Sequence, residues 1–122
     1  DGAEDDECVP DDERLCLGNG RFALRGTWTD FQGRQGVFHA VPSTDGSGFF
    51  WFFDENSIEV IVKLIDGCSL NDHRWVFLAA TTNVAYRLEV TDLRTGSVQR
   101  YSNLLGTRAA ATTDITAFGC TP

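Results

Sequence analysis

The chain has 122 residues, a net charge of -8 and 42% hydrophobic residues. This length suits one domain and is too short for two, and the ordinary composition excludes wholesale disorder, collagen and coiled coil. The charge is uneven, because eight of the 18 acidic residues lie within residues 1–13, which contain no Lys or Arg. The other ten acids balance the ten basic residues, so we expect an acidic N-terminal arm, residues 1–14, before a neutral domain, residues 15–122. Such a chain repels phosphate backbones, which argues against nucleic acid as a partner.

Apolar and polar residues alternate along most of the chain, and clusters of Gly, Asn and Asp interrupt the pattern, as is typical of β-strands joined by turns. The strands that we expect, in chain order, are 21–30, 36–41, 49–53, 58–65, 75–80, 84–91 and 98–102. We expect the remaining segment, residues 104–122, to lie across the fold with Ile115 and Phe118 as anchors. About seven strands at this spacing predict an all-β fold, an antiparallel β-sandwich of immunoglobulin-like architecture, with a small β-barrel as the alternative.

The segment 49–53 is the most aromatic part of the chain. In a strand, its five aromatic residues divide between two faces, with Phe50 and Phe52 on one of them. Both faces then need a cover, either from the rest of the domain or from a second molecule. The residues that we expect at contacts between copies of the chain are Phe49, Trp51 and Phe53, with Asp1, Glu4 and Asp5 of the acidic arm.

The four cysteines have no C-x-x-C spacing that would indicate zinc, and an even number in a short chain is typical of disulfides in an oxidising compartment. We favour the pairs Cys8–Cys16 and Cys68–Cys120, and the alternative joins Cys8 or Cys16 to Cys120. Met is absent and no apolar run approaches the ~18 residues of a membrane span. We therefore expect a processed, secreted protein, extracellular or at a cell surface, without membrane insertion.

Five short strings of the chain form a recognisable set, and they are 15–22 (LCLGNGRF), 28–33 (WTDFQG), 47–53 (SGFFWFF), 62–68 (VKLIDGC) and 75–77 (WVF). Together they resemble an uncharacterised β-domain of secreted bacterial proteins. The resemblance covers about residues 8–120. It implies export, attaches no enzymatic activity to the domain and supplies no catalytic residues.

No catalytic constellation stands out in the sequence, and we do not expect an enzyme. The two histidines, His39 and His73, lie near no nucleophile motif, and the cysteines are expected in disulfides. Calcium is the one cofactor to consider, because a bridged acidic loop gathers the oxygen ligands that this cation prefers. The candidate ligands are Asp5, Asp6, Glu7, Asp11, Asp12 and Glu13. Their spacing matches no EF-hand, and a solvated acidic tail is the simpler interpretation.

Exposed tryptophans stack on sugars, although tryptophans in strands belong more often to the core. The candidates for such a platform are Trp28, Trp51 and Trp75. Taken together, the sequence predicts a secreted structural or adhesive module that associates with copies of itself, as a homo-oligomer or polymer such as a filament or layer. The alternative is a calcium- or carbohydrate-binding accessory module, with a glycan or a cell surface as its partner.

Overall fold

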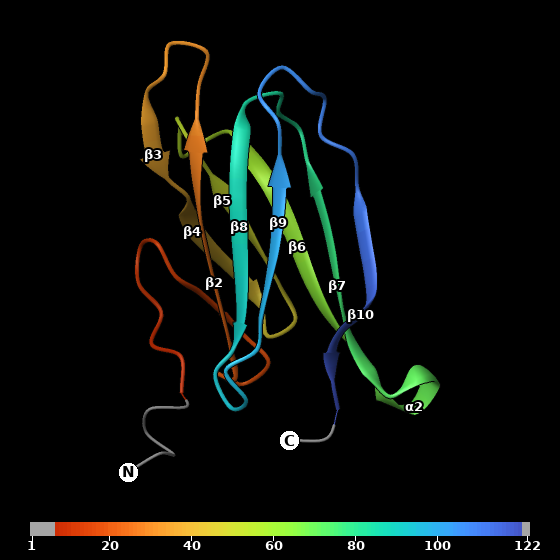
Figure 1. Ribbon diagram of the computed structural model, residues 1–122. Helices are drawn as coiled ribbons and strands as arrows, with labels where there is room; N and C mark the ends of the chain where they lie inside the picture. The colour runs from red at the N-terminus through yellow and green to blue at the C-terminus, as the bar shows by residue number, and fades with distance from the viewer. Residues whose placement is uncertain (1–6, 121–122) are drawn as a thin grey trace.

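A computed structural model describes residues 7–120, in which two antiparallel sheets face each other (Figure 1). Sheet A contains, in spatial order, β1 (Leu15–Leu17), β2 (Phe22–Thr29), β8 (Ala85–Asp92) and β9 (Val98–Asn103), with β3 (Gln35–Val37) also paired to β2. Sheet B contains, in spatial order, β10 (Thr112–Gly119), β7 (His73–Ala80), β6 (Ile58–Gly67), β5 (Ser47–Trp51) and β4 (His39–Thr44). A one-turn helix, α2 (Cys68–Asn71), follows β6. The β-sandwich is confirmed, and within residues 7–120 the two sheets do not join into a barrel.

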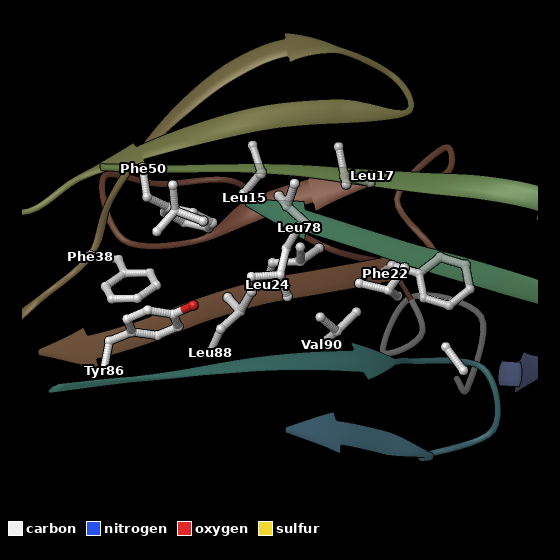
Figure 2. Packing of buried hydrophobic residues seen from close by; sticks show 14 of the residues in the cluster. Leu15, Leu17, Phe22, Leu24, Phe38, Phe50, Leu78, Tyr86, Leu88 and Val90 are labelled. Atoms are coloured by element: carbon white, nitrogen blue, oxygen red, sulfur yellow. The ribbon is translucent and has the colours of Figure 1, made fainter. Parts of the chain in front are cut away.

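The hydrophobic core fills the space between the two sheets, and both sheets contribute to it. Leu24 of β2 and Leu88 of β8 point inward from sheet A, and Leu78 of β7 approaches them from sheet B (Figure 2). Buried and more exposed residues alternate along these strands because successive side chains of a strand point to opposite faces. Each fully buried Leu or Phe contributes about 1.5–3 kcal/mol relative to an exposed one, so this layer holds the sheets together.

The expected strand 36–41 is divided into two, because the chain passes from sheet A to sheet B at Phe38. β3 pairs with β2, whereas β4 pairs with β5. Phe38 is fully buried, with ring centroids 5.1 Å from Phe50 and 4.5 Å from Phe52. Gly26 of β2 leaves room for this ring, since an added Cβ there would lie 2.5 Å from it.

The C-terminal segment forms an edge strand, β10, that the sequence did not predict. β10 pairs with β7, and the register of the pair shifts between Asp114 and Phe118. Phe118 is buried and packs on Phe22 with ring centroids 5.2 Å apart, which confirms it as an anchor. Ile115 is 48% exposed, so the expectation that it anchors the segment is wrong. Asp114 is opposite the buried Val76 of β7, so the next residue, Ile115, points to the outer side of sheet B.

Both favoured disulfides, Cys8–Cys16 and Cys68–Cys120, are present, each with Cα atoms 5.8 Å apart. The first holds residues 7–14 against the domain, where the Cys8 amide also donates to the Gly20 carbonyl at 2.7 Å. The second joins the start of α2 to the end of the chain. Within the described part of the chain, no helix has the length and apolar character needed to cross a bilayer.

Candidate interaction surface

The two outer faces of the sandwich differ in chemistry. The outer face of sheet A is polar: Arg25 and Thr27 of β2 lie beside Arg87 and Glu89 of β8. The outer face of sheet B is mainly apolar across its three central strands. We call this surface the aromatic face, and it consists of Phe49 and Trp51 of β5, Ile61 and Ile65 of β6, and Trp75 and Phe77 of β7. These residues alternate with buried or inward-facing neighbours, so the pleat of the strands directs them outward.

The strand register brings the members of the aromatic face together in rows. Phe49 is opposite Ile61, which is opposite Ala79 of β7. The row of Ile65 and Trp75 lies farther along the same strands. Directly opposite side chains in a sheet have Cβ atoms about 4.5–5.5 Å apart, which is contact distance. The aromatic face is therefore one continuous patch over β5, β6 and β7.

Trp51 is fixed at one side of the aromatic face by His39 of β4. The two rings are stacked, with centroids 3.9 Å apart and planes 15° from parallel, so the imidazole covers one face of the indole. His39 Nδ1 lies 2.7 Å from Oδ2 of Asp12, and the Ala40 amide donates to the Asp12 carbonyl at 2.7 Å. The N-terminal segment and β4 thus hold Trp51 in one orientation.

Trp75 is fixed at the opposite side by the short helix α2. Its indole Nε1 donates to Oδ1 of Asn71 at 2.8 Å, and the Asn71 amide nitrogen donates to the Ile115 carbonyl at 2.7 Å. Gly67 lies against the indole, and a side chain at this position would collide with the ring. The Phe77 ring lies nearly parallel, 11° from the Trp75 plane with centroids 6.0 Å apart. Both tryptophans of the aromatic face are therefore held by specific neighbours.

Two charged side chains of β6, Glu59 and Lys63, border Ile61 on the aromatic face. Lys63 is exposed and Glu59 is partly buried. Burial raises the pKa of the Glu59 carboxyl. The Thr81 amide donates to the Glu59 backbone carbonyl at 2.9 Å, whereas within residues 7–120 no group donates to the Glu59 carboxylate. Glu59 is therefore a partly desolvated acid that would gain from a nearby cation.

The predicted contact residues divide between the aromatic face and other places. Phe49 and Trp51 belong to the aromatic face. Trp51 and Trp75 lie on the outer surface of sheet B, whereas tryptophans in strands were expected more often in the core. Phe53 is 50% exposed but lies beyond the end of β5, where it packs edge-on against Trp28 with centroids 4.6 Å apart. The predicted contacts that lie outside the described residues are Asp1, Glu4 and Asp5.

The predicted calcium ligands that the structure describes have separate surroundings. Asp11 Oδ1 accepts the Glu13 and Arg14 amides, each at 2.8 Å, and the Asp12 carboxylate is paired with a histidine. Glu7 and Glu13 line different hollows, of about 280 and 300 Å³, on the side of sheet A. The predicted ligands that lie outside the described residues are Asp5 and Asp6. The calcium site therefore stays a prediction.

Among residues 7–120, the one group of three potential metal ligands that lie within 4.8 Å of one another is Asp66, Cys68 and Cys120. Both cysteine sulfurs of this group belong to the disulfide, which leaves one carboxylate. A single carboxylate is too few ligands for a metal centre.

The two histidines have different partners. His39 is paired with Asp12, and His73 Nδ1 lies 2.9 Å from the Asn71 backbone carbonyl. A nucleophile for acyl transfer is a hydroxyl or thiol within hydrogen-bond reach of its base. Neither histidine has such a group among its hydrogen-bond partners in the described part of the chain.

No family model, no curated protein and no solved structure matches the chain. The aromatic face was found only in part from the sequence, which identified Phe49 and Trp51 but did not place Ile61, Trp75 and Phe77 beside them. The available signal was on β6, where isoleucines alternate with valines and leave neither face of the strand polar. A sequence pattern shows which residues share a face, but not which strands lie next to each other.

Proposed function

We propose that this chain is a secreted structural module that associates with copies of itself through the aromatic face. The observation that carries the proposal is the contrast between the polar outer face of sheet A and the apolar outer face of sheet B. A sandwich needs only its inner faces to be apolar in order to fold, since an antiparallel sheet is stable with one face in water. Apolar side chains on a second face therefore point to a second layer of protein.

The size of the surface supports the same proposal. The three strands of the aromatic face, at ~4.8 Å spacing, and a central strand of ten residues at ~3.3 Å each span a sheet surface on the order of 500 Å². Monomeric proteins rarely expose contiguous apolar patches above a few hundred Å² unless the patch has a function. Two copies that cover such a face bury roughly 1,000 Å² in total, which is the size of a weak, concentration-dependent protein interface.

Secretion is supported by the two disulfides. All four cysteines of the chain are paired, and disulfides persist mainly in oxidising compartments outside the cytoplasm. The resemblance to a domain of secreted bacterial proteins points in the same direction and stays a prediction.

The alternative is that the aromatic face binds a glycan, which the outward positions of Trp51 and Trp75 favour. Sugar recognition uses the open face of an aromatic ring together with free polar groups. His39 already covers one face of Trp51, and Asn71 already accepts the indole N–H of Trp75. Fixed side chains of this kind suit a protein surface packed against them better than a mobile sugar chain, so self-association is the proposal that we favour.

The experiment is to compare the mass of the native chain in solution with that of Ile61→Thr, by light scattering after size exclusion. Ile61 is 38% exposed at the centre of the aromatic face, and threonine keeps the β-branched shape that a strand prefers. The matched control is Val98→Thr, which makes a similar change on the outer face of sheet A. We expect Ile61→Thr to weaken association and Val98→Thr to leave it unchanged. Equal behaviour of the two variants would contradict the proposal, and a native monomer that binds a sugar array would favour the glycan alternative.

A further inference from the structure

We propose that the partner on the aromatic face is a second copy related by a two-fold axis across the strands at Ile61, so that Glu59 of each copy meets Lys63 of the other. This inference rests on the proposed function and adds the geometry of the pair. It comes from the order of residues along β6, where the outward positions are Glu59, Ile61, Lys63 and Ile65 in turn.

Only certain axes bring two copies of one sheet face together. A two-fold axis must lie in the plane between the sheets, because an axis perpendicular to them leaves both faces pointing the same way. An axis parallel to β6 would place Lys63 against its own copy, with like charges opposed at the centre of the interface. An axis that runs across the strands makes the two β6 strands antiparallel instead, so residues at equal distances on either side of the axis meet.

The charges on β6 fit the axis across the strands. Glu59 and Lys63 each lie two residues from Ile61, about 7 Å along the strand, in opposite directions. A two-fold axis at Ile61 therefore forms two equivalent ion pairs, one on each side. Packed sheets lie about 10 Å apart, and a Glu and a Lys side chain together are long enough to meet across that gap. The partly buried Glu59 carboxylate would gain the cation that it lacks among the described residues.

The row of residues on the axis is compatible with it. The row that lies on it contains Phe49, Ile61 and Ala79, and no member of this row is charged. In the pair, each of these side chains faces its own copy, a position in which identical charges would repel each other. Glu59 and Lys63 are the charged side chains on the outer face of β5, β6 and β7, and both are used.

Such a contact is closed. The same surface is used on both copies, so the assembly stops at two chains unless a second surface takes part. The filament or layer expected from the sequence would need that second contact. The inferred product of the aromatic face alone is a dimer of 13.5 kDa chains, with strands antiparallel across the interface.

The test is a charge-swap series followed by sedimentation velocity at low salt. We expect Lys63→Glu and Glu59→Lys each to weaken the dimer by about tenfold or more, because each variant opposes two pairs of like charges. Two rescues are expected: a mixture of the two variants forms a heterodimer, and the double variant Glu59→Lys/Lys63→Glu forms a homodimer again. The matched controls reverse charges elsewhere, with Arg87→Glu on sheet A and Glu55→Lys in the loop before β6, and circular dichroism checks that each variant folds.

The outcomes separate the two proposals. Loss of the dimer in the single variants with rescue in the mixture and the double variant supports the two-fold geometry. A dimer that survives the single reversals, or one that is lost without rescue, overturns this geometry, while self-association through the aromatic face still stands if Ile61→Thr weakens it. A native chain that stays monomeric overturns both.

Discussion

Arg21 and Asp92 form a buried, two-pronged ion pair between the start of β2 and the end of β8. Arg21 Nε donates to Oδ1 of Asp92 and Nη2 donates to Oδ2, both at 2.8 Å, and the side chains are 7% and 1% exposed. Asp92 Oδ1 also accepts the Arg94 amide at 3.0 Å in the β8–β9 turn. The Leu93 amide donates to the Arg21 carbonyl at 2.9 Å. One carboxylate thus holds two turns together at the same end of the sandwich.

We expect Asp92→Asn to lower the free energy of unfolding by about 3–5 kcal/mol, because Arg21 then keeps a buried charge without its counter-ion. Urea denaturation followed by far-ultraviolet circular dichroism measures the change. The comparison is the double variant Arg21→Met/Asp92→Leu, which leaves no charge in the site and should lose less stability than Asp92→Asn. A loss below about 1 kcal/mol in Asp92→Asn would show that the pair is not needed.

Acid should weaken the fold through the same carboxyl group. Burial alone would raise the pKa of Asp92, but the hydrogen bonds from Arg21 and Arg94 and the Arg21 charge outweigh it, so the pKa lies below its ordinary value of 3.8. A carboxyl group whose pKa is lower in the folded than in the unfolded state stabilises the fold above the unfolded pKa. That stabilisation is lost as the pH falls through the folded pKa. We expect urea midpoints of the native chain to fall below about pH 4, and those of Asp92→Asn to fall less steeply. Parallel curves would contradict this assignment.

The two disulfides should differ in their contribution to stability. Cys68–Cys120 spans 52 residues and Cys8–Cys16 spans eight, so the longer loop restricts the unfolded chain more. The chain-entropy model gives about 4 kcal/mol for the long loop and about 2.5 kcal/mol for the short one. Replacing each pair with alanines and measuring thermal midpoints tests the order, and a larger loss for the Cys8–Cys16 pair would contradict it.

A single methyl group at Gly26 should destabilise the fold. An added Cβ would lie 2.5 Å from the Arg87 carbonyl oxygen and 2.5 Å from the Phe38 ring, both of which are fixed by the sandwich. Overpacking of this kind costs typically about 1–3 kcal/mol, so we expect a lower denaturation midpoint for Gly26→Ala. Gly119→Ala is the matched control, since its added Cβ has nothing within 4 Å. Similar losses in both variants would indicate a backbone effect rather than a collision.

The sequence predicted the architecture because alternation and turn residues are local signals. The strands around Phe22, Val62 and Leu88 follow from the period of two, and the disulfides follow from the positions of the cysteines relative to those strands. The crossing at Phe38 could not be predicted, because a single residue between two sheets continues the alternation without a break. The register shift in β10 could not be predicted either, because the extra residues of a bulge leave no signature in the sequence.

The aromatic face was harder to predict than the fold. Phe49 and Trp51 share a face with each other by alternation alone, but nothing local tells whether that face points to the core or to solvent. In the structure Phe50, which lies between them and points to the other face of β5, is fully buried against Phe38. Phe49 and Trp51 therefore point away from the core. The ion pair of Arg21 and Asp92 joins residues 71 positions apart, and a charged residue before a strand gives no indication of such a distant partner.

The central claim is that copies of this chain associate through the aromatic face. The most direct measurement is the sedimentation-equilibrium mass of the unmodified chain over a dilution series from high to low concentration. The account predicts a mass that approaches twice 13.5 kDa at high concentration and falls towards 13.5 kDa on dilution, with the transition moved to higher concentration in Ile61→Thr. A mass of 13.5 kDa at every concentration would contradict it.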